Sequence, residues 1–259
     1  MITLSSDFGT PYPAAMKGVI LDRCDARLVD VAHDFPRQDV RAAAFWLREV
    51  LPHFPPGVHL VVVDPGVGTD RAALVVRAGD HVLVGPDNGV LVPVARELAI
   101  SGTGQEEEAN VECFEVAVED PASSTFHGRD VFAPIAAAVH EESFEAFVEI
   151  PDVSQASDPE VLALPSADVE GDLALGEVLV VDGFGNVITN VPGRFLAGAD
   201  SVAADERVVP AVETFAAVEP GERLATVGSH GNVELDVNRG RGDEAFDLRP
   251  GDDVRLERR

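Results

Sequence analysis

Cysteine and long hydrophobic runs are both scarce in this sequence. The two cysteines, Cys24 and Cys113, stand far apart without metal-ligand spacing, so we expect two buried thiols and neither a disulfide framework nor a zinc site. No segment approaches the roughly 20 apolar residues of a membrane span. Residues 1–9 also lack the basic start and apolar run of a signal peptide. The sequence therefore predicts a cytoplasmic protein with no membrane partner.

Positive charge is also scarce. The chain has 46 acidic residues against 19 basic ones, a formal net charge of −27, and its only lysine is Lys17. Such a surface repels the phosphates of nucleic acids and anionic lipids, which argues against both as partners. Repulsion among acidic side chains destabilises a compact fold in dilute buffer and is screened within about 3 Å in molar salt. We therefore expect a halophilic protein of a salt-rich cytoplasm; the alternative is a protein that is merely acidic.

Apolar residues, in contrast, are sufficient for a large core. The chain has 259 residues, 46% of them hydrophobic, and is long enough to fold as one large domain or two moderate ones. In the first 165 residues, segments typical of strands alternate with segments typical of helices. The strand-like segments are 1–5, 26–32, 58–64 and 81–85, and the helix-like segments are 14–24, 40–51, 90–99 and 131–141. This alternation predicts an α/β domain with a mainly parallel sheet flanked by helices.

The sequence changes character after residues 157–172, a segment rich in Pro, Asp and Ser that we interpret as a linker. Beyond it, short valine-rich segments are separated by Gly, Pro, Asn and Asp turns, a pattern typical of an antiparallel sandwich or a small barrel. We therefore predict an α/β domain over residues 1–165 and a smaller all-β, barrel-like domain over residues 166–259. Residues 105–110, QEEEAN, are expected to form an exposed acidic loop.

Three aspartates follow strand-like segments within Gly or Pro turns. They are Asp7 in LSSDFG, Asp64 in VVVDPGVG and Asp87 in LVGPDNG. If the strands are parallel, all three carboxylates lie along one sheet edge, which is where open α/β sheets bind ligands. Aspartate in such a turn is also ordinary turn chemistry, which is the alternative for each residue taken alone.

Several familiar site motifs are missing. The glycines of DPGVG and DFG fit neither G-x-G-x-x-G nor the P-loop pattern, and no G-x-S-x-G elbow of a serine hydrolase occurs. His33 with Asp34, and His127 with Asp130, could bind a metal, but no H-E-x-x-H or comparable pair supports this, so we expect no catalytic metal.

Residues 124–130, STFHGRD, are a polar run that opens an apolar helix. Sites often form at such helix starts, although a capped helix start is the plainer explanation.

Six segments carry a resemblance that the individual motifs do not. In chain order they are SSDFGTPYPAAMKGVI, VVVDPGVGTDR, GPDNGVL, STFHGRDVFAP, DGFGNVITN and GSHGNVELDVNRG. Together they resemble the signature blocks of the S-adenosyl-L-methionine (SAM) hydroxide adenosyltransferases, relatives of the fluorinating and chlorinating enzymes that use the same substrate. The resemblance implies an N-terminal α/β domain, a C-terminal β-barrel and a homotrimer with active sites between the N-terminal domain of one subunit and the C-terminal domain of its neighbour. It also implies hydrolysis of SAM to adenosine and L-methionine, with SAM as substrate and no cofactor or metal.

The resemblance places the catalytic residues at Asp64, Arg71 and His127. In this reaction water attacks the ribose C5′ in line with the departing sulfur, and methionine leaves as a neutral thioether that needs no acid. Water is a poor nucleophile and must be oriented and relieved of a proton. A carboxylate beside Arg71 suits Asp64 to orienting the water, whereas an imidazole, with an unperturbed pKa of about 6.5, is the more natural proton acceptor. The residues alone leave open which of the two takes the proton.

The resemblance also implies a set of substrate-binding residues. Asp7 matches a carboxylate that binds the ribose hydroxyls, and Phe126 is expected to pack on the ribose or the adenine. Asn186 offers a donor and an acceptor to an adenine edge. Asp182 and Ser229 match the methionine end. The whole expected set is Asp7, Phe126, Asp182, Phe184, Asn186, Ser229, Glu234 and Asn238.

The chain departs from the family pattern at two places. Ser6 stands where the family often has Thr, and NRGRGDEAF stands where many relatives have an alanine-rich run. The second departure affects the details of the adenine pocket around Asn238 and Arg239.

Two other functions remain as alternatives. A halogenase of the same fold would use chloride in place of water, but halogenating relatives tend to have Tyr where this chain has His127. A noncatalytic protein that binds adenosine or SAM would need Asp7 and Asn186 but not the three catalytic residues.

Overall fold

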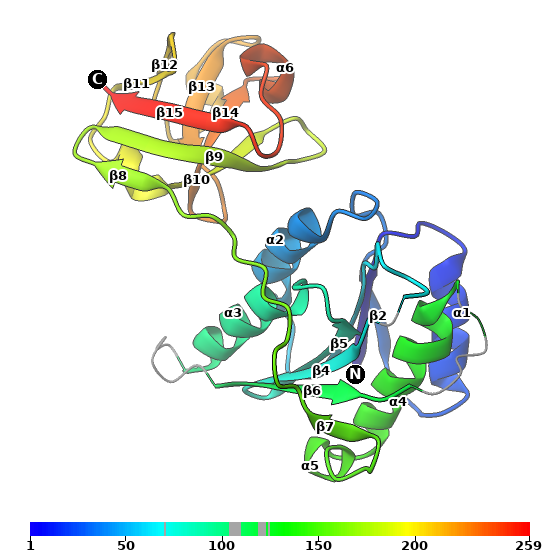
Figure 1. The fold of residues 1–259 in the computed structure, drawn as a ribbon. Coiled ribbons are helices and arrows are strands. Elements are labelled where there is room, and N and C mark those ends of the chain that lie inside the picture. The colour runs from blue at the N-terminus through cyan, green and yellow to red at the C-terminus, as the bar shows by residue number, and fades with distance from the viewer. Residues whose placement is uncertain (70, 104–109, 119–122, 124) are drawn as a thin grey trace. The chain divides into compact units, whose positions relative to one another are not determined.

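The computed structural model describes the chain except for residues 70, 104–109, 119–122 and 124. The predicted acidic loop therefore lies outside the described residues apart from Asn110. Two compact units are present, Met1–Ala163 and Leu164–Arg259 (Figure 1). In the described parts of both units, no helix has the length and apolar character needed to cross a membrane.

A mixed sheet forms the centre of the first unit. Over the described residues it has seven strands in the order β2-β1-β3-β5-β4-β6-β7. Strands β2, β1, β3 and β5 pair in parallel, and β4, β6 and β7 join them in antiparallel pairs. Their bounds are β1 Ile2–Ser6, β2 Leu28–Ala32, β3 Val58–Val62, β4 Ala73–Ala78, β5 His81–Pro86, β6 Val111–Val116 and β7 Val153–Gln155.

The predicted parallel sheet is confirmed, because the four segments expected as strands are the four that pair in parallel. The three antiparallel strands were not expected from the alternation of strands and helices. Strand β4 is joined to β5 by a tight turn at Gly79, whose φ of 58° favours glycine, and no helix separates the two strands. Antiparallel neighbours need only such a turn, so the helix pattern does not reveal them.

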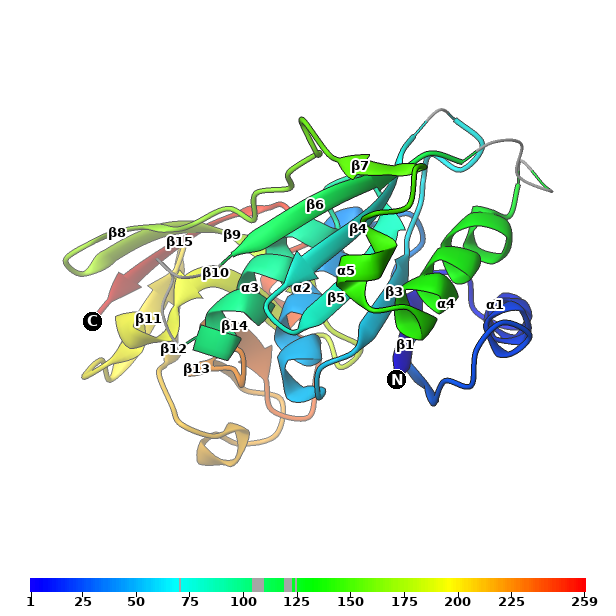
Figure 2. The ribbon, with the colours of Figure 1, turned by 90° about the horizontal axis from the view of Figure 1, so that it is seen from below.

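Helices cover both faces of this sheet, as predicted. Their bounds are α1 Tyr12–Leu21, α2 Val40–Val50, α3 Leu91–Thr103, α4 Ala133–Glu141 and α5 Phe144–Phe147, with 3-10 turn η1 at Leu51–His53 and π-helical turn η3 at Gly128–Phe132. Figures 1 and 2 show α1 and α4 on one face of the sheet and α2 and α3 on the other. Strand β3 contributes buried side chains to both faces of the sheet, since Leu60 and Val62 pack on the α1 side and Val61 packs on the α3 side.

The second unit is an antiparallel barrel that is nearly closed. Its described strands follow the order β12-β11-β15-β9-β10-β14-β13, and β8 also pairs with β9. A bridge between Ala211 and Ala225 brings the two ends of this sheet together. The bounds are β8 Asp168–Glu170, β9 Leu173–Val181, β10 Val187–Pro192, β11 Ser201–Ala204, β12 Arg207–Pro210, β13 Arg223–Val227, β14 Asn232–Val237 and β15 Asp253–Arg258, with α6 at Gly242–Phe246, η4 at Gly193–Leu196 and η5 at Phe215–Ala217. The predicted all-β, barrel-like C-terminal region is confirmed.

Candidate active site

Two of the three strand-end aspartates line a large cavity in the first unit. Asp7 follows β1 and Asp64 follows β3, so both lie at the carboxyl edge of the parallel strands. The cavity has a volume of about 690 Å³ and is lined by Asp7, Phe8, Tyr12, Arg37, Gln38, Asp64, Val67, Ser123, Thr125, Phe126 and Arg129. Asp87 is not among these residues, and its carboxylate accepts the backbone N–H of Glu160 at 2.7 Å. The sheet edge therefore provides two carboxylates to the cavity rather than three.

Asp64 and Arg71 form an ion pair within one turn. Asp64 Oδ1 accepts hydrogen bonds from Arg71 Nη1 at 3.1 Å and from the N–H of Gly66 at 3.0 Å. The Asp64 side chain is only 5% exposed. A Cβ at position 66 would lie 2.6 Å from the Arg71 guanidinium carbon, so a larger residue there would displace the guanidinium from its present position. The turn thus fixes the carboxylate and holds a cation against it.

His127 lies beside Asp64 at the start of η3. Both residues line a smaller pocket of about 60 Å³, together with Phe8, Val62, Val67, Thr125, Phe126 and Gly128. This volume is enough for at least one water molecule. Arg71 and His127 also share a separate pocket of about 420 Å³. The three predicted catalytic residues are therefore neighbours. Among the described residues, no hydrogen bond joins His127 to Asp64 or Arg71, so neither of them occupies the ring nitrogens of His127.

An aromatic cluster forms one wall of the large cavity. Phe126 packs edge-on against Phe8 and Tyr12, with ring centroids 5.9 and 5.4 Å away. The Arg129 guanidinium lies over the Phe126 ring, 5.2 Å from its centroid. A Cβ at Gly128 would come within 3.2 Å of Phe126, so glycine allows the rings to pack against the η3 turn. Phe126 is therefore placed to offer an apolar surface to a ligand in the cavity.

Asp7 is fixed by a backbone group that the sequence analysis missed. Its Oδ2 accepts the N–H of Gln38 at 2.7 Å, and the residue is only 8% exposed. Gln38 and Arg37 both line the cavity. Gln38 has a φ of 62°, an unusual backbone conformation that no sequence motif indicates. The remaining acceptor capacity of Asp7 is available to a ligand hydroxyl.

The two histidine–aspartate pairs considered as metal ligands have other partners. Arg129 donates two hydrogen bonds to Asp130, at 2.6 and 2.7 Å, and these hold the pKa of Asp130 below its usual range. His33 Nδ1 lies 2.8 Å from Ser6 Oγ, and His33 Nε2 lies 2.9 Å from an oxygen of Asp30. In the ranges that the structure describes, no group of three or more His, Cys, Asp or Glu residues could hold a metal ion.

In the second unit, residues 182–186, the start of the DGFGNVITN segment, connect β9 to β10. Asp182 accepts hydrogen bonds from the N–H of Phe184 at 2.9 Å, from the N–H of Asn186 at 2.9 Å and from Asn186 Nδ2 at 3.1 Å. The Phe184 side chain is 80% exposed, which is unusual for a large apolar residue. The Asp182 carboxylate thus organises its own loop, and Phe184 at the tip of this loop is exposed.

Two other predicted residues lie near the start of β14, Ser229 in the turn before the strand and Glu234 on the strand. Glu234, only 7% exposed, lies 2.9 Å from His230 Nε2. A Cβ at Gly228 would collide with the Glu234 carboxylate, so the glycine next to Ser229 makes room for this pair. Asn238 instead donates to the carbonyl of Val218 at 2.7 Å and is tied to a neighbouring loop. His230 belongs to the GSHGN segment, but nothing in the sequence separated it from the residues around it.

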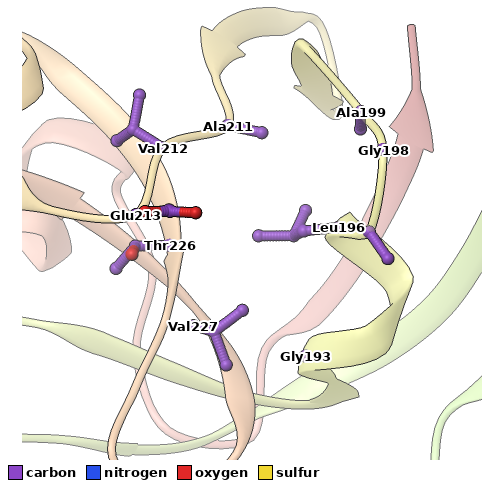
Figure 3. A pocket seen from close by; sticks show the side chains of 10 residues that line it. Gly193, Leu196, Gly198, Ala199, Ala211, Val212, Glu213, Thr226 and Val227 are labelled. Carbon is purple, nitrogen blue, oxygen red and sulfur yellow. The ribbon is translucent and has the colours of Figure 1, made fainter.

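A pocket elsewhere in the barrel contains none of the predicted residues. It has a volume of about 540 Å³ and lies between η4 and β13 (Figure 3). Figure 3 shows mostly small or apolar side chains around it, with the Glu213 carboxylate as the charged group. Nothing in this lining resembles the paired ionic groups of the first unit.

Comparison with known proteins gives a consistent result over nearly the whole chain. The family model described as SAM hydroxide adenosyltransferase N-terminal domain matches residues 2–147, and the corresponding C-terminal domain model matches residues 176–255. The chain is 38% identical to an (R)-S-adenosyl-L-methionine hydrolase of Salinispora tropica, covering 98% of this chain and 97% of the relative. It is 41% identical to a protein of the same name from Thermus thermophilus, covering 97% of both. The crystal structure of an uncharacterized conserved protein from Thermotoga maritima aligns over 100% of both chains with a TM-score of 0.82 and 34% identity. The chain therefore belongs to the SAM hydroxide adenosyltransferase family.

Proposed function

We propose that this protein hydrolyses SAM to adenosine and L-methionine, as the names of its curated relatives indicate for those proteins. The observation that carries the proposal is the small pocket between Asp64 and His127, which adjoins the large cavity through shared lining residues. A nucleoside in the large cavity would have its reacting carbon near a confined water molecule. The partly buried ion pair of Asp64 and Arg71 supplies the fixed charge beside that water.

The chemistry follows from these positions. The sulfonium of SAM leaves as a neutral thioether, so the side chains act on the attacking water. Asp64, held by Gly66 and Arg71, accepts a hydrogen bond from the water and aligns it with C5′. His127, which has no competing hydrogen bond to Asp64 or Arg71 among the described residues, accepts the proton as the C–O bond forms. The proton ends on the imidazole, the C5′–S bond breaks, and its electron pair goes to sulfur.

The binding roles remain proposals of the same kind. Asp7 binds the ribose hydroxyls and Phe126 packs against the nucleoside, with Asn186 on the adenine edge. Asp182 and Ser229 contact the methionine end, and Phe184, Glu234 and Asn238 complete the contacts. These residues are divided between two units, so we propose a homotrimer in which the first unit of one subunit and the second unit of its neighbour form each site. The expected cytoplasmic location and halophilic character also stay predictions.

The decisive experiment identifies the products and the origin of the new oxygen. The purified protein is incubated with SAM in water enriched in oxygen-18, with chloride or a chloride-free salt and with or without EDTA, and the nucleosides are analysed by chromatography and mass spectrometry. Adenosine labelled at the 5′ oxygen in every condition supports hydrolysis without a metal. His127→Ala should abolish it, whereas His53→Ala, a change at an exposed histidine of the same unit, should not.

Three other outcomes would contradict the proposal. A 5′-chloro nucleoside that appears only with chloride would identify a halogenase. Binding of SAM without any turnover would identify a noncatalytic binding protein. Loss of activity with EDTA would require a metal that the proposed mechanism does not use.

A further inference from the structure

The second unit contains a buried carboxyl group that the proposed chemistry does not use. Asp236 on β14 is completely buried, and neither of its carboxylate oxygens accepts a hydrogen bond of normal geometry from the described residues. Burying an ionised carboxylate without donors is costly because the charge loses its hydration. The neutral acid is therefore the favoured form at this position.

The position of Asp236 links it to Glu234. The two residues are two apart on β14, so both side chains leave the same face of the strand. Leu235 between them points to the other face, into the barrel core. Glu234 is also buried, at 7% exposed. Two carboxyl groups in contact do not both ionise readily in a buried place, and a hydrogen bond between them requires one proton.

Glu234 is held from its other side by His230. The Nδ1 atom of His230 accepts the N–H of Asn232 at 3.2 Å, so the ring proton lies on Nε2 and is donated to Glu234 Oε1 at 2.9 Å. Glu234 therefore accepts this hydrogen bond and has acceptor capacity for a second donor. The proton of Asp236 is the donor that fits this position.

The charges around the pair are mainly negative. The carboxylate of Asp182, in the β9–β10 loop, repels a negative charge on Asp236. The nearby cation, Arg241, donates hydrogen bonds to Asp243 at 3.0 and 2.7 Å. Burial and the carboxyls of Glu234 and Asp182 raise the pKa of Asp236 to about 8, partly offset by the amide of Val187. The positions on β10 and β13 that pair with Glu234 or Asp236 are not titratable: Ile188, Leu224 and Thr226.

We propose that Asp236 and Glu234 share one proton and act as a single monoanionic pair, with Asp236 as a positioning residue that holds Glu234 in the substrate site. This inference rests on the proposed function, in which Asp182 and Ser229 contact the cationic methionine end nearby. One negative charge on the pair complements one ammonium group. Loss of the shared proton adds a second charge without a donor, and repulsion then separates Glu234 from His230 and weakens binding.

The first test needs no substrate and is independent of turnover. The infrared spectrum of the ligand-free protein is compared between about pH 6.5 and about pH 9.5, a range that spans the titration of the pair. The wild type should lose one carbonyl-stretch band of a neutral carboxylic acid. Asp236→Asn should lack that change, and Asp253→Asn, the same substitution at an exposed position of the barrel, should retain it. The same spectral change in wild type and Asp236→Asn would overturn the proposal.

The second test concerns ligand binding. Dissociation constants for SAM and for adenosine, which lacks the methionine end, are measured over the same pH range. The affinity for SAM is compared between wild type and Asp236→Asn at each pH. From low to high pH, the affinity of the wild type should fall about fivefold more than that of the variant, the size expected for loss of one hydrogen bond to a charged group. The comparison with the variant removes the effect of titrating the substrate's own amino group. Equal pH dependence of wild type and variant for SAM would overturn the positioning role, even if the infrared result held. If SAM is bound but not hydrolysed, the proposed function fails while this test remains valid.

Discussion

Arg71 donates a hydrogen bond to Asp64 across a turn in which its guanidinium occupies the space beside Gly66 that a Cβ would fill. The contact joins a buried carboxylate to the cation seven positions later, and both belong to the short segment that follows β3. The proposed orientation of water depends on this local arrangement.

Gly66→Ala should therefore impair catalysis more than folding. The added Cβ forces the guanidinium away from Asp64. A displacement of about 1 Å in a catalytic group costs about 100-fold in kcat. Gly18→Ala is the matched control, because a Cβ at that helical position meets nothing within 4 Å. Steady-state kinetics and thermal melts of both variants are the measurement. A Gly66→Ala enzyme with wild-type kcat would show that the ion pair is not needed.

The hydrolysis rate should fall as the pH drops below about 6.5, where imidazoles ordinarily take up a proton. A protonated His127 cannot accept a proton from water. The measurement is kcat as a function of pH at saturating SAM. A constant rate down to about pH 5 would instead assign the proton to Asp64.

Two adjacent serines on β1 should respond in opposite ways to alanine. Ser6 Oγ is hydrogen-bonded to the His33 ring, whereas Ser5 Oγ is buried and has no partner among the described residues. Ser6→Ala leaves His33 Nδ1 without its partner and should lower the free energy of unfolding by about 1–2 kcal/mol. Ser5→Ala removes an unsatisfied hydroxyl and should be neutral or stabilising. Denaturant unfolding measures both, and equal losses would contradict the assignment of these contacts.

A buried histidine, His59, should make the first unit sensitive to acid. His59 is fully buried between Thr3 and His81, with contacts of 2.8 Å to each, and burial lowers the pKa of His59 to about 3. The unfolded state then binds the proton more strongly than the folded state. The stability contributed by neutral His59 is complete above about pH 6.5 and is lost progressively as the pH falls towards about 3.

The loss should be on the order of 5 kcal/mol for the wild type as the pH falls from about 6.5 to about 3. His59→Gln, which retains an amide donor and acceptor, should show a smaller dependence of unfolding free energy on pH. The exposed His53→Ala variant should keep the wild-type dependence. Identical pH curves for wild type and His59→Gln would refute the role of His59.

The charge of −27 should make folding depend on salt. Screening in molar KCl removes most of the long-range repulsion among the acidic side chains, so the melting temperature should rise by roughly 10 °C over dilute buffer. NaCl at equal ionic strength should give the same rise, while an equal osmolarity of sucrose should give less. An unchanged melting temperature in molar salt would rule out the halophilic adaptation.

Local patterns in the sequence predicted the parallel half of the first sheet, its four covering helices and the all-β second unit. Hydrophobic periodicity indicates whether a segment is a strand or a helix, and strands that alternate with helices favour a parallel sheet. The position of Asp64 at the sheet edge follows from the same logic. Six short segments, read in order, were sufficient to identify the family.

Contacts between distant residues were decided by the tertiary structure alone. Asp87 also follows a strand of the parallel sheet, as Asp64 does, yet its carboxylate accepts a hydrogen bond from the backbone N–H of Glu160. Asp236 lies on the face of β14 opposite to the core residue Leu235, and strand alternation alone would leave that face in solvent. The packing around β14 instead buries Asp236 completely beside Glu234. Burial and proton sharing depend on which chain segments cover a side chain. That information is spread over residues far apart in the sequence, so no local pattern contains it.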